Sequence, residues 1–314
     1  MANLHELFLQ FDEDLRIKSS KKERIMKSRD NLREKIRNYF KDNYPNYHPK
    51  FYIQGSYKMN TSIRTKDDTC DLDDGVYFKN NPDKVTSTTL QEWVKNAVDE
   101  VTVDVRHRKK CITVNYVADY NIDLPVYLFD QDLDEHPSLA VKNEGWRKDD
   151  PREMIDKFND AKREKCQLIR IVRYLKAWSN SKGPNMPTGL AMTILAMDNF
   201  YQNSSDDVAL KFTLIEIENT LKRSFQCKIP ATPYDDVFEN YDSIRKTFFM
   251  DNLSAFIIDA KKAVDEVRNQ YKASQLWKGH LGDKFPNGED VDEKSTEASA
   301  IIPIIGNSKP YCLG

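Results

Sequence analysis

The chain has 314 residues, a length typical of about two domains. Its 48 Lys and Arg residues against 50 Asp and Glu residues give a formal net charge of −2. This balance disfavours a protein whose main work is to coat duplex nucleic acid, because such proteins are usually basic. Fifteen Tyr, fifteen Phe and four Trp residues supply enough aromatic surface for a folded core, which argues against wholesale disorder.

No feature of the sequence predicts export, membrane insertion or a structural zinc. The amino terminus lacks a basic region followed by an apolar stretch, so no signal peptide is expected. The longest nearly apolar run, residues 188–197, is about half the length that a membrane span needs. The cysteines show no paired CxxC spacing, and there is no HExxH motif. We therefore expect a cytoplasmic protein that does not contact membranes.

Residues 1–45 are expected to form two helices. Apolar residues recur there at helical spacing between charged positions, as Ile25, Leu32, Ile36 and Tyr39. Ser19 and Ser20 offer a break between the helices and an N-cap for the second one.

From residue 51 to residue 129 the pattern changes to short segments rich in β-branched and aromatic residues, which predict strands. The expected strands are Phe51–Gln54, Asp71–Phe78, Val101–Val105, Cys111–Val117 and Ile122–Phe129. A helical segment at 88–98 interrupts them. The combination predicts an α/β region built on a small mixed sheet.

After Asp150 and Pro151, which resemble an N-cap followed by proline at the first helical position, the chain becomes helical again. One apolar stripe runs from Leu168 to Trp178 and a longer one from Leu253 to Tyr271. We expect a sheet lobe with the N-terminal helices over 1–140 and a helical lobe over 141–314, with the boundary within 130–150. An acidic loop over 287–300 is expected to precede the apolar segment 301–305.

The segment Gln54-Gly55-Ser56-Tyr57-Lys58 comes at the end of an expected strand. A Gly-Ser step that leaves a strand and enters a helix presents backbone N–H groups and a hydroxyl, and glycine permits close approach to the backbone. Such a turn suits a polyphosphate. The dipeptide alone is common, so its weight depends on what accompanies it.

Three carboxylates accompany it. Asp71 and Asp73 project to the same side of their strand because side chains alternate, and two hard oxygen ligands at that spacing suit Mg²⁺. Asp123, between apolar neighbours in a later strand, is the expected third carboxylate, with Asp119 in reserve. The alternatives are a turn with solvated acids and, for Asp123, an exposed strand acid or one paired with Arg106 or Arg108.

This set of motifs resembles the polymerase-beta-like nucleotidyltransferases, and more narrowly the cGAS/DncV-like nucleotidyltransferases (CD-NTases) of bacterial anti-phage (CBASS) systems. The resemblance spans about residues 50–290 and rests on several blocks: Gln54–Lys58, Cys70–Phe78, Trp146–Pro151, Leu175–Trp178, Leu276–Trp277 and Gly282–Pro286. It implies a polymerase-beta-like core with a mixed sheet, joined to a helical lobe.

The resemblance also implies roles for single residues. Asp71, Asp73 and Asp123 would bind two Mg²⁺ ions, for which Mn²⁺ is a possible substitute, and Asp123 would help to activate the attacking ribose hydroxyl. Gly55 and Ser56 would hold the β- and γ-phosphates of the donor nucleotide. The remaining expected nucleotide-binding residues are Gln54, Lys58, Lys176 and Thr188, with Lys176 reaching the triphosphate and Arg173 as a weaker candidate beside it.

Such enzymes join nucleoside triphosphates into a cyclic oligonucleotide that activates a partner effector protein. For this chain the resemblance favours a purine-containing cyclic dinucleotide, such as cyclic di-GMP or cyclic GMP-AMP, over a trinucleotide. Two alternatives stay open: a transferase acting on a small molecule, a protein or an RNA end, and a nucleotide-binding protein that has lost catalysis. Tyr57 and Tyr234 are candidates for stacking on the bases, and Asn185, Asp235 and Asp236 are candidates for contacts with the base edges.

Activation by nucleic acid is not expected. The animal DNA sensor of this superfamily carries a His/Cys zinc insertion, and this sequence has no such cluster. Its only dense basic stretch, residues 106–110, is expected at a strand edge or hairpin rather than at a duplex-binding surface.

Overall fold

The computed structural model describes residues 2–116, 119–163 and 165–292. The chain divides into two compact units. We call the described residues of 17–159 and 229–235 the sheet unit, and the described residues of 1–16, 160–228 and 236–292 the helical unit.

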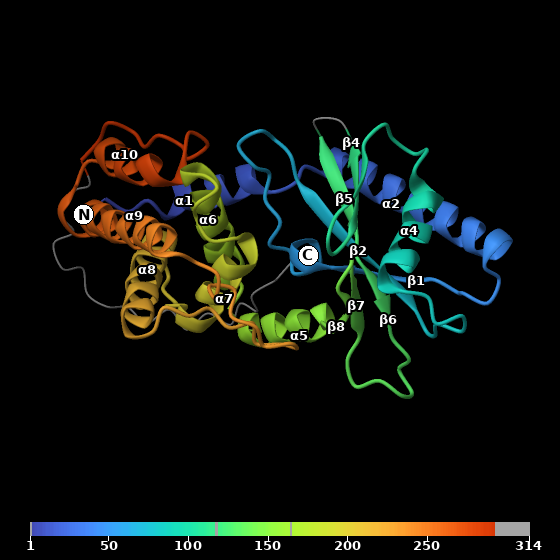
Figure 1. Cartoon of the computed structure of the whole chain (residues 1–314). Coiled ribbons are helices and arrows are strands. Elements are labelled where there is room, and N and C mark those ends of the chain that lie inside the picture. The colour runs from blue at the N-terminus through green and yellow to red at the C-terminus, as the bar shows by residue number, and fades with distance from the viewer. Residues whose placement is uncertain (1, 117–118, 164, 293–314) are drawn as a thin grey trace. The chain divides into compact units, whose positions relative to one another are not determined.

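In the described part of the sheet unit, eight strands form one mixed sheet in the order β3-β4-β5-β2-β6-β7-β8, with β1 paired to β2 (Figure 1). The central strand β2 runs parallel to β5 and β6 and antiparallel to β1. The strands are β1 (Lys50–Gln54), β2 (Asp71–Phe78), β3 (Val105–His107), β4 (Ile112–Tyr116), β5 (Tyr120–Leu124), β6 (Val126–Leu128), β7 (Ser138–Val141) and β8 (Gly145–Lys148).

One face of this sheet is apolar. Leu72, Val76 and Phe78 alternate along β2 and are fully buried in a core with residues of α2 (Ser19–Asn43) and α4 (Ser87–Val98). Full burial of each such side chain contributes about 1.5–3 kcal/mol. Asp74 also lies on this side, where the guanidinium of Arg33 in α2 donates to both of its oxygens. The opposite face therefore receives the residues between them, including Asp71 and Asp73.

The expected strands and the break before α2 are largely confirmed, with three differences in detail. Ile122–Phe129 is divided into β5 and β6 because Pro125 has no N–H to continue the ladder. Residues 101–103 are a bend, and the strand β3 begins only at Val105. Ser19 does not cap α2, since it is the first helical residue and Lys18 holds the cap position without a side-chain hydrogen bond.

The helical unit contains α1 (His5–Leu15) together with a series of later helices. The later helices are α6 (Gln167–Lys182), α7 (Gly189–Asn199), α8 (Asp206–Arg223), α9 (Ser243–Lys261), the π-helical turn η1 (Lys262–Glu266) and α10 (Gln270–Leu281). The chain enters this unit through α5 (Pro151–Lys162), whose first turn is capped as expected by Asp150, which accepts from the N–H groups of Arg152 and Glu153.

Helix α1 belongs to the helical unit although it begins the chain. The ring of Phe8 packs edge-on against Tyr174, Trp277 and Phe285 at centroid distances of 5.1, 4.9 and 4.9 Å. Conversely, β7, β8 and the first nine residues of α5 belong to the sheet unit. The units thus differ from the expected ranges 1–140 and 141–314, because apolar periodicity identifies a buried helix face without identifying what covers it.

Two further expectations concern the C-terminal part. The apolar stripe from Leu253 to Tyr271 is not one helix: α9 ends at Lys261, η1 follows, and α10 begins at Gln270. The expected loop 287–300 is described only as far as residue 292, and the apolar segment 301–305 lies outside the described residues.

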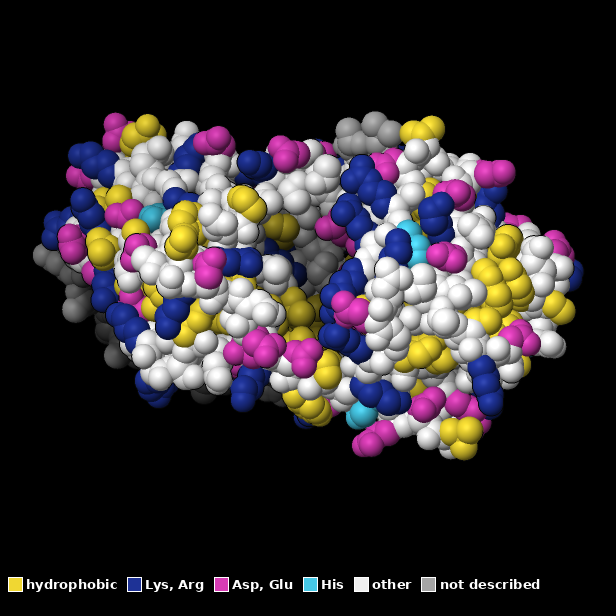
Figure 2. Space-filling model, viewed as in Figure 1, with side chains coloured by type: hydrophobic (Ala, Val, Ile, Leu, Met, Phe, Trp, Pro, Cys, Tyr) yellow, Lys and Arg dark blue, Asp and Glu magenta, His cyan; other side chains and the backbone are white. Residues whose placement is uncertain are grey.

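The surface carries charges of both signs. On the face that Figure 2 presents, basic and acidic side chains are interspersed and apolar side chains form small separate groups. The dense basic stretch 106–110 lies, as expected, at the antiparallel β3–β4 hairpin on the sheet edge. Within the described residues, no helix combines the length and the apolar character needed to cross a membrane.

Candidate active site

The three predicted carboxylates lie on adjacent strands of the sheet. Asp73 of β2 is the Cα partner of Asp123 in the parallel strand β5, and Asp71 is the partner of Asn121. Neighbouring strands are about 4.8 Å apart, so partner residues present their side chains next to each other on one face. Two strands that are far apart in the sequence therefore bring Asp71, Asp73 and Asp123 together.

The electrostatics of Asp71 reflect this proximity. Loss of solvent around its carboxyl raises the pKa of Asp71, a hydrogen bond of 3.2 Å from the amide of Asn121 opposes that rise, and the charge of Asp123 adds to it. Ionised carboxylates this close repel each other, and a cation relieves the repulsion. The donor set consists of hard oxygens, which suits Mg²⁺ or Mn²⁺.

Gly55 shows how closely the Gly-Ser turn approaches these carboxylates. It directly follows β1 and begins the four-residue helix α3 (Gly55–Lys58) with a φ of +63°. A Cβ at this position would lie 2.0 Å from Oδ2 of Asp73. Only glycine therefore allows the turn and the carboxylate to lie side by side, an arrangement that fits a metal-bound polyphosphate.

The hydroxyl of Ser56 lies beside a second serine. The Oγ atoms of Ser56 and Ser62 are 2.8 Å apart, and the carbonyl of Ser56 accepts from the N–H of Thr61 at 2.9 Å. These contacts fold residues 56–62 into a compact turn. Lys58 lies in α3 with an exposed side chain.

The side chain of Gln54 forms hydrogen bonds with two tyrosines of the sheet in this structure. Its amide oxygen accepts from the hydroxyl of Tyr77 at 3.1 Å, and its amide nitrogen donates to the hydroxyl of Tyr127 at 3.3 Å. The two tyrosine rings are stacked with centroids 4.5 Å apart. The side chain of Gln54 is thus buried and hydrogen-bonded to residues of β2 and β6.

Asp123 has a defined hydrogen-bond partner. The hydroxyl of Thr113 in β4 donates to its Oδ1 at 2.5 Å, and Thr113 is the Cα partner of Asp123 in the β4–β5 ladder. The sulfur of Cys111 lies 3.7 Å from the Thr113 hydroxyl. Burial, together with the charge of Asp123, raises the pKa of the Cys111 thiol to about 12, so the thiol stays protonated at neutral pH.

The reserve candidate Asp119 and the alternative partner Arg106 each form ion pairs with other residues. Asp119 forms ion pairs with Lys21 at 2.9 Å and with Arg24 at 2.6 Å. Burial alone would raise the pKa of Asp119, but the hydrogen bonds from these two cations outweigh it and lower the pKa. Arg106 pairs with Asp104 at 2.6 Å rather than with Asp123.

Lys176 and Thr188 belong to the helical unit. The stem of Lys176 lies against Gly189, where an added Cβ would come within 3.4 Å of the lysine Cε. Thr188 is the N-cap of α7 and accepts from the N–H of Ala191 at 3.3 Å. The two residues thus lie at one corner, where α7 begins against α6.

The weaker candidates have structural partners. Arg173 is buried and forms an ion pair of 2.7 Å with Asp12. The hydroxyl of Tyr234 donates to Glu153 at 3.0 Å. Asp236 accepts from the N–H groups of residues 227 and 238, and the carbonyl of Asn185 accepts from Arg245. Tyr57 is half-buried, and burial raises its pKa.

A second group of possible metal ligands lies elsewhere in the sheet unit. Among the described residues, one ligand atom each from His136, Asp150 and Glu153 all lie within 4.8 Å of one another. Their carboxylates already have structural tasks: Asp150 caps α5, and Glu153 accepts from the N–H of Thr232 at 2.8 Å. The hydrogen bonds of this group therefore stabilise the positions of residues 229–235 and of the start of α5 within the sheet unit.

Sequence reasoning missed Thr113, Asn121 and Ser62. Each is a polar residue that hydrogen-bonds a predicted site residue from a position fixed only by strand register or by a turn. Pairing Cys111–Val117 with Ile122–Phe129 as a hairpin could have placed residue 113 opposite Asp123, but a one-residue error in register reverses the face.

Part of the sheet unit is similar in sequence to a known protein family. Residues 49–127, within the sheet unit, match the family described as cyclic GMP-AMP synthase DncV-like, nucleotidyltransferase domain. A cyclic GMP-AMP synthase of Escherichia albertii is 28% identical over 195 residues, which make up 55% of this chain. The match spans 43% of that relative's length, so the chain covers less than half of it.

Solved structures share the fold over most of the chain. Vibrio cholerae DncV cyclic AMP-GMP synthase superposes with a TM-score of 0.80 at 16% identity, over 91% of this chain and 98% of that one. The same protein in complex with the linear intermediate pppA(3′,5′)pG superposes with a TM-score of 0.82 at 17% identity, over 93% and 99%. The fold is thus that of the polymerase-beta-like nucleotidyltransferases, and residues 49–127 are similar to the DncV-like nucleotidyltransferase domain.

Proposed function

We propose that this chain is a metal-dependent nucleotidyltransferase that makes a cyclic dinucleotide from nucleoside triphosphates. The observation that carries the proposal is the β2–β5 register, which sets Asp73 beside Asp123, with Gly55 in contact with Asp73. The family match and the relatives named as cyclic dinucleotide synthases support the reaction class.

Asp71, Asp73 and Asp123 would hold two Mg²⁺ ions, or Mn²⁺ in their place. Bound ions supply charge that stabilises both the attacking and the leaving oxygens of an in-line displacement. Asp123 takes the proton of the attacking ribose hydroxyl. Because Oδ1 of Asp123 accepts from Thr113, we assign the proton transfer to Oδ2.

The other proposed residues bind and orient the triphosphate. Gly55 and Ser56 contact the β- and γ-phosphates, and Lys58 is an exposed cation on the same turn. Lys176 neutralises charge on the leaving pyrophosphate. Thr188 takes a more limited part, since its hydroxyl already caps α7. Holding both reactants in this way converts a reaction between two molecules into one within a complex.

The product is proposed to contain a purine, as cyclic di-GMP or cyclic GMP-AMP, and to activate an effector protein in a cytoplasmic anti-phage system. GTP-bound and linear-intermediate complexes have been solved for the similar Vibrio cholerae protein, which supports nucleoside triphosphates as substrates here. We propose basal activity without nucleic acid, in line with the nearly balanced charge of the chain.

The test is product formation. The purified protein is incubated with ATP, GTP, CTP and UTP in the presence of Mg²⁺, and phosphatase-resistant products are identified by mass spectrometry. We expect a cyclic dinucleotide with at least one purine. Linear products or a labelled acceptor would indicate the alternative transferase, and binding of nucleotide without release of pyrophosphate would indicate a protein without catalysis.

The matched variants are D71N combined with D73N, and D67N. Asn keeps the size of the side chain but removes the charge that binds the metal, so the double variant should lose at least about 10²-fold in rate. Its fold should persist because like-charge repulsion is removed. Asp67 is an exposed acid of the same unit, and its substitution should leave the rate unchanged. Equal rates for both variants would contradict the assignment.

A further inference from the structure

The strand next to the candidate metal site carries a hydroxyl aimed at one of its carboxylates. Thr113 in β4 faces Asp123 across the antiparallel ladder, and its Oγ1 lies 2.5 Å from Oδ1 of Asp123. Only 7% of Thr113 is exposed. Water therefore competes poorly for this hydrogen bond, and hydrogen bonds to ionised groups are about twice as strong as neutral ones.

The direction of the hydrogen bond follows from chemistry. An ionised carboxylate can only accept hydrogen bonds. The hydroxyl of Thr113 is therefore the donor in its hydrogen bond to Asp123. The hydroxyl oxygen can then accept the S–H of Cys111, whose sulfur is 3.7 Å away on the same side of β4. Thr113 is also β-branched, which restricts its first side-chain torsion. The hydroxyl is thus fixed by its strand, its rotamer and its neighbours.

We propose that Thr113 is a positioning residue for the reaction: its hydrogen bond to Oδ1 fixes the plane of the Asp123 carboxylate and so orients Oδ2 toward the metal and the attacking hydroxyl. The inference rests on the proposed function of Asp123. Asn121 stands in the same relation to Asp71, as the partner across the β2–β5 ladder, with a longer hydrogen bond of 3.2 Å. Thr113 is the stronger case because its contact is shorter and better buried.

Thr113→Val and Thr113→Ser separate orientation from packing. Val has nearly the shape of Thr but lacks the hydroxyl, whereas Ser keeps the hydroxyl and lacks the methyl group. The control is Thr102→Val, which makes the same change at a buried hydroxyl that has no hydrogen-bond partner among the described residues. Urea unfolding of all variants shows whether each still folds.

The first readout is binding of Mn²⁺ alone, measured by electron paramagnetic resonance without nucleotide. We expect Thr113→Val to weaken binding about 10–100-fold, as loss of a group that orients a ligand does. Thr113→Ser should stay within about threefold of the wild type, and Thr102→Val should match it. Unchanged Mn²⁺ binding in Thr113→Val, or equal losses in the Val and Ser variants, would overturn the proposal, as would a wild-type chain that binds no Mn²⁺.

The second readout is steady-state synthesis at saturating metal. A positioning residue acts on the chemical step, so kcat should fall at least about tenfold in Thr113→Val while KM for GTP changes less than about threefold. If the wild-type chain makes no product yet binds Mn²⁺, the proposed function fails, and the Mn²⁺ comparison still decides whether Thr113 orients Asp123.

Discussion

At the scale of single residues, the site depends on contacts that leave no room for a side chain. Gly55 combines a left-handed backbone with direct approach to Asp73. The left-handed conformation alone costs a residue with a Cβ about 1–2 kcal/mol. The contact with Asp73 adds a second effect, because a side chain at residue 55 would displace the carboxylate of Asp73 in addition to straining the backbone.

Gly55→Ala is therefore expected to impair activity beyond its effect on stability. The new Cβ would lie 2.0 Å from Oδ2 of Asp73, so the carboxylate must move. A displacement of about 1 Å near reacting groups can reduce the rate about 10²-fold. The measurement is kcat for product synthesis, with Mn²⁺ affinity as a check on the metal site.

Gly145→Ala is the matched control. Gly145 also has a positive φ, of +88°, and lies in the sheet unit, but an added Cβ would meet no atom of the described part of the chain within 4 Å. It should show the backbone cost in unfolding and keep its rate. If the two variants lose activity equally, the contact between Gly55 and Asp73 has no part in catalysis.

Strand alternation was sufficient to predict the carboxylates but not the residues that hold them. The two-residue spacing of Asp71 and Asp73 defines a shared face without knowledge of the fold. Thr113 and Asn121 acquire their roles only through register, and Gln54 is engaged by Tyr77 and Tyr127, which no local pattern indicates.

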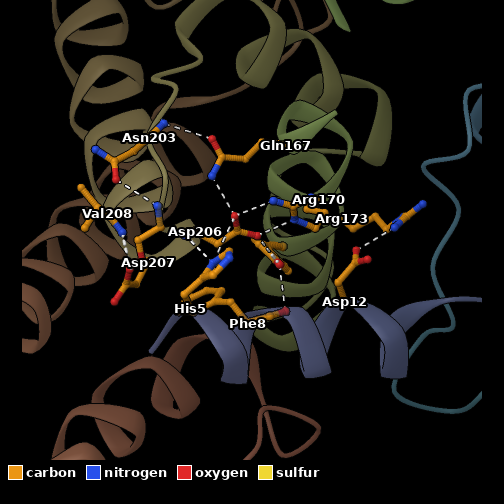
Figure 3. Close-up of polar contacts among 12 residues, drawn as sticks. His5, Phe8, Asp12, Gln167, Arg170, Arg173, Asn203, Asp206, Asp207 and Val208 are labelled. Atoms are coloured by element: carbon orange, nitrogen blue, oxygen red, sulfur yellow. Dashed lines mark hydrogen bonds and ion pairs between the residues drawn. The ribbon is translucent and has the colours of Figure 1, made fainter. Parts of the chain in front are cut away.

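At the scale of elements, the position of α6 depends on a buried polar network (Figure 3). Asp206 at the start of α8 accepts from the guanidinium of Arg170 at 2.6 and 2.8 Å and from Gln167 at 2.7 Å. The hydroxyl of Tyr174 lies 2.8 Å from the same carboxylate. These partners all come from α6, which also carries Lys176.

This network predicts a loss of stability in acid. Burial alone would raise the pKa of Asp206, but hydrogen bonds from Arg170, Gln167 and Tyr174 outweigh it and lower the pKa. A lowered pKa means that the ionised form stabilises the folded state. The contribution is complete above the ordinary carboxyl pKa of about 3.9 and is lost as pH falls below it.

Asp206→Asn is expected to reduce the free energy of unfolding by about 3–5 kcal/mol at neutral pH, because it leaves Arg170 without its buried partner. In urea unfolding, the stability of the variant should also decline less steeply than that of the wild type between about pH 5 and pH 3. Glu216→Gln, at an exposed position of the same helix, should keep the wild-type slope. Parallel pH profiles for Asp206→Asn and the wild type would contradict this account.

The sequence predicts where the helices lie along the chain better than it predicts which elements they pack against. The stripe from Leu168 to Trp178 lies within α6, and the segment 88–98 corresponds to α4. The stripe from Leu253 to Tyr271 extends from α9 into α10, since the apolar spacing persists through η1, where the hydrogen bonding changes. The apolar spacing of a sequence indicates which side chains are buried. A break in the backbone that keeps the same side chains buried does not change this spacing, so the spacing does not reveal the break.

At the scale of the whole molecule, sequence order and unit membership diverge. The chain begins in the helical unit, passes to the sheet unit at residue 17, returns at residue 160 and crosses again for residues 229–235. Helix α1 is thus separated by more than 140 residues from the helices that it packs against. The helical unit cannot complete its core from the second half of the chain alone.

Deletion of residues 2–16 is therefore expected to loosen the helical unit and to spare the sheet unit. The deletion removes Phe8 and Phe11 from the aromatic core and leaves Arg173 without Asp12. Loss of one buried Phe side chain costs about 3–5 kcal/mol. Hydrogen exchange followed by mass spectrometry should show faster exchange in α6 and α8, with β2 and β5 protected as in the full chain.

A substitution on the same helix distinguishes lost packing from a general effect of altering the terminus. Glu13 is exposed on α1, so Glu13→Ala should leave exchange unchanged in both units. If the deletion increased exchange in β2 and β5 as much as in α6 and α8, the two units would unfold together and α1 would stabilise the whole chain. Faster exchange confined to the helical unit would instead show that α1 is part of the core formed by the helices of the second half of the sequence.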